Sequence, residues 1–212
     1  LWAGCAETWA KLFFEEEQIH RCLLRAEEQS ASLCAWQESA VMWKTLLQDD
    51  TRARRCMTRM EDMAKDFSDL LLCVRSYAYL FDDPSHVADS IKKAERVSAG
   101  AHEWSLCAWA WGKFCRDADA SRRCLKKAEA LAESAYDWVS CAEVWKDHGG
   151  DIPRSRQCLE RAETVAAHTD DQIKCANAWR DVHGEEDRMR RCLEKGESVA
   201  KDTWTWISAA KA

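Results

Sequence analysis

The chain has 212 residues, of which 47% are hydrophobic and 32% are charged, so it contains enough apolar residues to bury a core. Seven glycines and two prolines are too few for the many turns of an all-β protein, and no apolar run approaches the roughly 18 residues of a membrane-spanning helix. The net charge of −6 is spread along the chain without a basic patch, so we expect neither nucleic-acid binding nor membrane insertion.

A period of 34 residues runs through the sequence without insertion or deletion. It divides the chain into segments 1–34, 35–68, 69–102, 103–136, 137–170 and 171–204, followed by a partial segment at 205–212. We number the positions of each segment from 1 to 34. Each complete segment predicts a first helix, a short turn and a second helix.

The first helix of each segment carries apolar or small residues at positions 2, 5, 6 and 9, with Gln172 at position 2 of the sixth segment as the exception. This i, i+3, i+4, i+7 spacing is typical of a helix with one buried face. Position 9 is aromatic in every complete segment, and we interpret it as a structural position of the core. Its residues are Trp9, Trp43, Tyr77, Trp111, Trp145 and Trp179.

The second helix repeats this arrangement at positions 22, 23 and 26, with a basic residue at position 25 and a glutamate at position 27. Because buried indole and phenol groups need hydrogen-bond acceptors, we expect each glutamate to accept a bond from a packed aromatic residue or arginine and so to lock the helix pair. Equal copies along the chain favour this structural role over catalysis. The glutamates are Glu27, Glu61, Glu95, Glu129, Glu163 and Glu197.

The turns between the two helices contain residues that start helices, such as Asp151 and the run Asp82, Asp83 and Pro84. A single helical hairpin cannot bury its own apolar face, whereas stacked hairpins bury a continuous core. We therefore predict an all-α protein with one domain over residues 1–212. Its expected architecture is an α-solenoid of six 34-residue helix-turn-helix repeats plus a truncated first helix of a seventh.

This pattern resembles the tetratricopeptide repeat, whose first helix carries W-x₂-L-G-x₂-Y and whose second carries A-x₃-F-x₂-A. The matching residues of the fifth segment are Trp138, Cys141, Ala142 and Trp145 in the first helix and Ser155, Leu159 and Ala162 in the second. The chain departs from the family in several residue types, in one extra residue between the two helices and in the missing closing proline. The resemblance implies a divergent, Trp- and Cys-rich scaffold for protein or peptide binding, with the first helices on its concave side.

Positions 3, 7, 10 and 11 share a second face of the first helix and vary between segments. This variation is expected if the solenoid recognises an extended ligand through different side chains on otherwise similar repeats. The alternative is that these positions vary because they are exposed and no contact constrains them. The large apolar residues Val41, Tyr79 and Trp109 favour a contact surface. The predicted ligand-binding residues of this concave face are Glu7, Lys11, Val41, Lys44, Arg75, Tyr79, Trp109, Lys113, Glu143, Asp147, Asn177 and Arg180.

Ten of the twelve cysteines occupy positions 5 and 22, where the two exceptions are Ser39 and Ser90. If the two positions formed a regular series of disulfides, each serine would leave one cysteine without its partner. Buried thiols that act as small hydrophobic groups in a reducing compartment therefore explain the pattern better. A Cu(I) store is disfavoured because no helix carries Cys-x-x-Cys. We expect His148 and His183 to be solvated helix ends, and we expect neither a metal site nor a cofactor.

The sequence contains no phosphate-binding glycine loop, nucleophile elbow or His-x-x-x-His motif with a partner glutamate, so we expect no enzyme activity. We predict a cytoplasmic scaffold that recognises a protein or peptide partner through the concave first-helix face. One alternative is a structural rod that self-associates end to end without a peptide ligand. A less favoured alternative is soft-metal binding by the cysteines.

Overall fold

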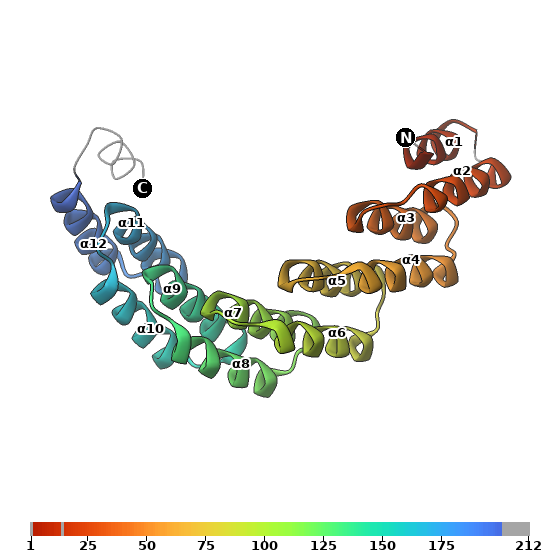
Figure 1. Ribbon diagram of the computed structural model, residues 1–212. Helices are drawn as coiled ribbons and strands as arrows, with labels where there is room; N and C mark the ends of the chain where they lie inside the picture. The colour runs from red at the N-terminus through yellow and green to blue at the C-terminus, as the bar shows by residue number, and fades with distance from the viewer. Residues whose placement is uncertain (1, 14, 201–212) are drawn as a thin grey trace. The chain divides into compact units, whose positions relative to one another are not determined.

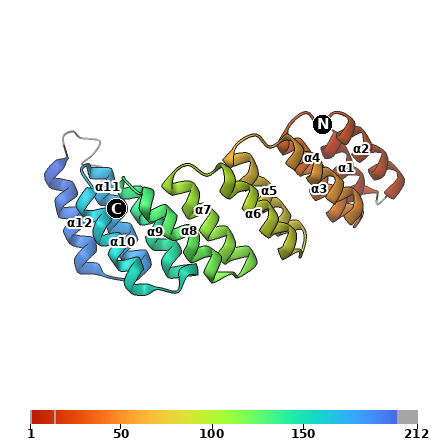
Figure 2. The ribbon, with the colours of Figure 1, turned by 60° about the horizontal axis from the view of Figure 1, so that its bottom comes forward.

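The computed structural model describes residues 2–13 and 15–200 (Figures 1 and 2). These residues form twelve α-helices and three π-helices and contain no strand, which confirms the all-α prediction for this part of the chain. None of the described helices combines the length and hydropathy required to span a lipid bilayer. Residues 205–212, predicted to begin a seventh segment, lie outside the described residues.

The chain divides into two compact units, Leu1–Val97 and Ser98–Ala212. The helices described in the first unit are α1 (Trp2–Leu12), α2 (Glu16–Glu28), α3 (Leu33–Leu46), α4 (Asp50–Met63), α5 (Phe67–Leu80) and α6 (Pro84–Val97). Those of the second unit are α7 (Ala101–Ala110), η1 (Trp111–Cys115), α8 (Ala118–Leu131), α9 (Ala135–Val144), η2 (Trp145–Gly149), α10 (Ile152–Val165), α11 (Thr169–Ala178), η3 (Trp179–His183) and α12 (Glu186–Val199).

Within each unit, every α-helix packs against the next one along the chain, and each odd-numbered helix also contacts the next odd-numbered helix. In the second unit, α7, α9 and α11 form one row and α8, α10 and α12 form another (Figure 1). The second helices α4, α6, α8, α10 and α12 begin at residues 50, 84, 118, 152 and 186, which reproduces the period of the sequence. Three further expectations stay predictions: that the chain is a single domain, that it has six repeats, and that these repeats form a solenoid.

The predicted packing positions form the cores of the two units. The side chains of Trp43, Leu125, Leu159 and Trp179 are fully buried, whereas Trp9 is half-buried. A fully buried leucine of this kind stabilises the fold by roughly 2 kcal/mol relative to an exposed one. The apolar spacing read from the sequence therefore identifies the buried helix faces.

All twelve cysteines lie within the described residues, and each is a free thiol. At positions 5 and 22 the cysteines are buried, with the exception of the exposed Cys5. Burial raises the pKa of Cys56, Cys73, Cys141 and Cys175 to about 12. These thiols are therefore neutral at pH 7 and pack as small apolar groups, because the thiolate is the form that attacks or binds metals.

Each π-helix begins at the tryptophan of position 9, and each is followed by a residue in the left-handed conformation. After η2 this residue is Gly150, with φ of 70°, and the N–H of Asp151 then donates to the carbonyl of Trp145 at 3.3 Å. The side chain of Asp151 accepts from the N–H of Arg154 and caps α10. Because a π turn holds more residues than an α turn, it accommodates the extra residue between the two helices.

Candidate functional site

The glutamate of position 27 is best defined in the second unit, where Glu129 is buried at the end of α8. Its Oε1 accepts hydrogen bonds from Trp145 Nε1 at 2.5 Å and from Arg154 Nε at 3.0 Å, and its Oε2 pairs with the same guanidinium. Cys158 Sγ lies 3.6 Å from Oε1 as a further donor. Burial opposes the charge, but the bonds from Arg154 and Trp145 outweigh it and lower the pKa of Glu129.

In the first unit, Glu61 meets donors from positions 18, 22 and 25 of the following segment, of which 18 and 22 also serve Glu129. It accepts hydrogen bonds from His86 Nε2 at 2.9 Å, Ser90 Oγ at 3.1 Å and Lys93 Nζ at 2.6 Å. Ser90 stands where other segments have cysteine, and its hydroxyl takes the place of the thiol as a donor to the carboxylate. This exchange gives a physical reason for one serine exception in the cysteine pattern.

At the junctions of Glu163 and Glu27, position 18 of the next segment supplies the closest cation. Glu163 pairs with Arg188 at 3.3 Å, and Glu27 pairs with Arg52 at 3.7 Å. The indole nitrogens of Trp43 and Trp179 are buried without a hydrogen bond, so these aromatic residues do not donate to a glutamate as Trp145 does. Glu95 is half-buried, and Glu197 is exposed.

Sequence reasoning did not identify the role of position 18, although the signal was present. Four of its six residues are cationic or can become so. Arg52 and Arg188 each lie about 5 Å from the ring of the tryptophan at position 9 of their own segment, and His86 stacks on Tyr77 at 3.8 Å. One residue therefore contacts its own first helix and the glutamate of the preceding segment. The residues of position 18 are Gln18, Arg52, His86, Ala120, Arg154 and Arg188.

The constant basic residue at position 25 has two kinds of partner. In the fourth and fifth segments it lies over the tryptophan of position 2, with Lys127 3.9 Å from the Trp104 ring and Arg161 4.8 Å from the Trp138 ring. The third and sixth segments have Leu70 and Gln172 at position 2. There the lysines of position 25 reach the preceding glutamates instead, in the pairs Lys93–Glu61 and Lys195–Glu163.

In the first unit, the predicted ligand-binding residues lie along α1, α3 and α5. Glu7 and Lys11 pair with each other at 2.7 Å, and Lys44 pairs with Asp50 at 2.5 Å. Because these exposed pairs are individually weak, they remain open to exchange with a ligand. Val41 is half-buried, and Arg75 and Tyr79 are exposed.

In the second unit, three of the predicted residues come together in a hollow of about 300 Å³. We call it the first-helix hollow, because α7, α9, η2 and η3 contribute its walls. Lys113, Asn177 and Arg180 are predicted residues that do not line it. The lining residues are Trp109, Glu143, Val144, Lys146, Asp147, His148, Asp181 and Val182.

The first-helix hollow carries more negative than positive charge. Its carboxylates belong to Glu143, Asp147 and Asp181, and its ammonium belongs to Lys146, whose Nζ donates to the backbone carbonyl of Asp181 at 3.1 Å. Partial burial, followed by the nearby carboxylates, raises the pKa of Glu143. A cationic group entering the hollow would relieve this repulsion.

The walls of the hollow are held by close packing. The Trp109 ring meets Phe114 edge to face at 5.1 Å. His148 lies directly on Gly112, since a Cβ added to that glycine would be 2.3 Å from the His148 Cβ. Burial lowers the pKa of His148, so its imidazole is neutral at pH 7. The sequence placed positions 7, 10 and 11 on this face but did not predict positions 8 and 12, which also line the hollow.

His148 and His183, expected to be solvated helix ends, are both half-buried against neighbouring residues. His183 Nε2 lies 3.2 Å from Ser155 Oγ, and His148 packs on Gly112. Among residues 2–13 and 15–200, no group of three or more His, Cys, Asp or Glu side chains is arranged to hold a metal ion.

Comparison with known proteins gives no relative from which a role could be inferred. No protein-family model matches the sequence, and a search of curated proteins finds no significant match.

Proposed function

We propose that this protein is a tetratricopeptide-like α-solenoid that binds an extended peptide along its first helices, and that the first-helix hollow receives a basic side chain of that peptide. The observation that carries the proposal is the hollow itself. Residues from three successive first helices, at the positions expected to vary with the ligand, converge there on one space. The site includes Trp109, Glu143 and Asp147 from the predicted set.

The chemistry of the hollow favours a lysine or arginine side chain. Three carboxylates and one ammonium line the hollow, and Asp181 is also paired with Arg180 at 2.8 Å. A cation therefore gains most attraction beside Glu143 and Asp147, where the existing charges repel one another. The face of Trp109 offers a cation–π contact worth roughly 0.5–2 kcal/mol, depending on desolvation. Val144 and Val182 provide apolar surface for the methylene stem that both basic side chains carry.

The spacing of the first helices suits an extended chain. Packed helices lie about 8–10 Å apart, and an extended peptide advances about 3.3 Å per residue. Every third residue of the peptide would therefore meet the next first helix. A peptide of about six to nine residues could contact α7, α9 and α11 in turn.

Two fluorescein-labelled octapeptides test the proposal. Both consist of serine, alanine and leucine around one central residue, which is arginine in the first peptide and citrulline in the second. Fluorescence anisotropy measures their Kd for the full chain and for the variants Trp109→Ala and Glu143→Gln. Each variant is expected to weaken arginine-peptide binding about five- to tenfold, since a desolvated cation–π or charge-assisted contact contributes about 1–1.5 kcal/mol. Arg190→Gln on the exposed side of α12 is the control and should leave the Kd unchanged.

Equal affinity of both peptides for all three proteins would contradict the proposal. If the peptides do not bind and the mass in sedimentation equilibrium rises with protein concentration, the rod that self-associates end to end would replace it.

A further inference from the structure

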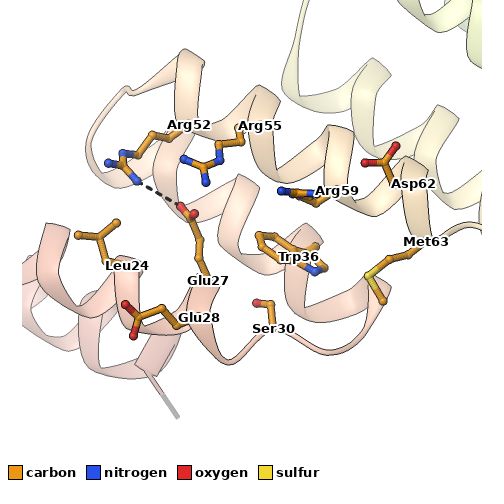
Figure 3. Close-up of a pocket in the computed structure, with 10 residues that line it drawn as sticks. All are labelled: Leu24, Glu27, Glu28, Ser30, Trp36, Arg52, Arg55, Arg59, Asp62 and Met63. Carbon is orange, nitrogen blue, oxygen red and sulfur yellow. Dashed lines mark ion pairs between the residues drawn. The ribbon is translucent and has the colours of Figure 1, made fainter.

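A second hollow, of about 660 Å³, lies in the first unit on the side of the second helices. We call it the arginine hollow. Figure 3 shows three arginines along α4 facing α2, with Trp36 from α3 and Met63 at one end. Its lining residues are Leu24, Glu27, Glu28, Ser30, Trp36, Arg52, Arg55, Arg59, Asp62 and Met63.

The arginine hollow lies at the junction of Glu27, whose contact with its cation is longer than those of Glu61, Glu129 and Glu163. Glu27 reaches Arg52 at 3.7 Å (Figure 3), whereas Glu61 accepts a bond from His86 at 2.9 Å. The Glu27 Oε1 atom is buried and has no hydrogen bond. The hollow therefore lies beside a junction that is less tightly closed than these three.

In the fourth and fifth segments the same place is closed by a stacked cation. In the fourth segment Lys127 covers the Trp104 ring at 3.9 Å, and in the fifth Arg161 covers Trp138 at 4.8 Å. In the second segment the corresponding residues, Arg59 and Trp36, both line the arginine hollow, and no cation–ring contact joins them among the described residues.

Two arginines of the hollow have no ion-pair partner. Among the charged lining residues, Glu27 pairs with Arg52 at 3.7 Å, and Glu28 pairs at 3.4 Å with Arg25, which lies outside the hollow. Arg55 and Arg59, which lie four residues apart on α4, form no ion pair with a described residue. The three carboxylates of the lining balance its three arginines in number, but the guanidinium groups of Arg55 and Arg59 keep donors for a ligand.

We propose that the arginine hollow is a second peptide-binding site, which receives an acidic residue next to a large apolar residue. The carboxylate binds the guanidinium groups of Arg55 and Arg59, whose planar donors match a carboxylate in two parallel hydrogen bonds. The apolar side chain packs on Trp36 and Met63. The volume lies within the range of about 300–1,000 Å³ that is typical of ligand sites.

The charges of the hollow favour a carboxylate over a phosphorylated ligand. A carboxylate brings one negative charge to the two guanidinium groups, whereas phosphate groups bring about two or more negative charges against the carboxylates of Glu28 and Asp62 on the same walls. The site therefore prefers the opposite charge from the first-helix hollow. The two sites lie in different units and can be disabled separately.

The test uses the fluorescein-labelled peptide Gly-Ser-Asp-Phe-Asp-Leu-Ser-Gly-amide and a version with asparagine in place of both aspartates. The full chain is expected to bind the acidic peptide at least about tenfold more tightly than the asparagine version, because a bidentate charge-assisted contact is lost. The double variant Arg55→Gln/Arg59→Gln is expected to lose the same factor. The control Arg96→Gln/Arg190→Gln removes two exposed charges elsewhere and should bind like the wild type.

Trp36→Ala tests the apolar part of the site, with circular dichroism to verify that the helical content is retained. Its affinity for the acidic peptide should fall, while its affinity for a peptide with leucine and phenylalanine replaced by serine should not change.

Equal binding of the aspartate and asparagine peptides would overturn the proposal. Binding of ATP with the same arginine dependence, in the absence of peptide binding, would overturn it in favour of a nucleotide site. Neither of these two results affects the proposed function, because binding of the arginine peptide near Trp109 is measured in a separate experiment.

Discussion

The indole Nε1 of Trp145 donates a 2.5 Å hydrogen bond to Oε1 of Glu129, which lies sixteen positions earlier in the preceding segment. Arg154 binds the same carboxylate from the following helix, so three helices meet at one buried charge. A buried carboxylate is stable only when such donors replace its hydration. Successive helix pairs of this unit are therefore joined by a specific polar contact as well as by apolar packing.

Replacement of Glu129 by alanine should lower the free energy of unfolding by about 2–3 kcal/mol, because it leaves the buried Trp145 indole and the Arg154 guanidinium without their acceptor. Arg154 is partly exposed, so water recovers part of the loss. Urea titrations followed by circular dichroism measure the effect. Glu133→Ala, at an exposed site, should change stability by less than about 0.5 kcal/mol. Similar losses in both variants would contradict the role of Glu129.

Serine should be tolerated at Cys158, since Ser90 already fills this position in the third segment and donates to Glu61 at 3.1 Å. The variant Cys158→Ser is expected to stay within about 1 kcal/mol of the wild type, because it keeps a donor of similar size for Glu129. Leu159→Ala, which removes buried methyl groups next to it, should cost about 2–5 kcal/mol. Thermal unfolding compares the two, and a reversed order would contradict the thiol's role as a donor.

The thiols provide an independent check of burial. Ellman's reagent should modify Cys5 and Cys34 rapidly in the folded protein, because both are exposed. Cys56 and Cys141 should react only after unfolding, since burial raises the pKa of each to about 12. Rapid reaction of all twelve thiols under native conditions would exclude a packed thiol core.

Acidification from pH 7 to pH 5 should lower the urea midpoint. Burial lowers the pKa of His148 and His183 below the ordinary value of 6.5. The unfolded chain therefore binds more protons than the folded chain once the pH falls below about 6.5, and stability is lost from there down to the folded pKa. The variant His183→Gln should show a smaller decrease. An unchanged midpoint between pH 7 and pH 5 would contradict the burial of these rings.

An alanine at Gly112 should destabilise the second unit by about 1–3 kcal/mol, which is typical of overpacking. Its Cβ would lie 2.3 Å from the Cβ of His148, so η2 must move away from η1. Gly4→Ala is the matched control, because a Cβ there meets nothing within 4 Å and lies in a helix that alanine favours. The displacement should also weaken arginine-peptide binding, since His148 lines the first-helix hollow.

The sequence predicted the helices and their buried faces because apolar side chains recur at a spacing that only helices satisfy. It also located the glutamates, which are constant at position 27. It did not identify their partners, such as Arg154 for Glu129, because these lie 25 residues later in the next segment. Which residues meet across such a junction depends on the distance and angle between helices, and periodicity does not contain that information.

The first-helix hollow was predicted in part for a similar reason. Trp109, Glu143 and Asp147 follow from the assumption of a regular α-helix. The same assumption places position 10, which Lys146 occupies, on this face. His148 lines the hollow from position 12, within the π turn that begins at Trp145. A single extra residue between two helices fits a longer loop as well as a π turn, so the sequence alone leaves this choice open.

A thermodynamic cycle of two peptides and two proteins tests the proposed function most directly. Arginine and citrulline octapeptides are titrated against the wild type and Glu143→Gln at pH 7 and equal ionic strength. The account predicts that the wild type prefers arginine over citrulline about fivefold or more, and that Glu143→Gln loses most of this preference, which corresponds to a coupling of about 1 kcal/mol. A preference for arginine that is identical in both proteins, or absent from both, would contradict it.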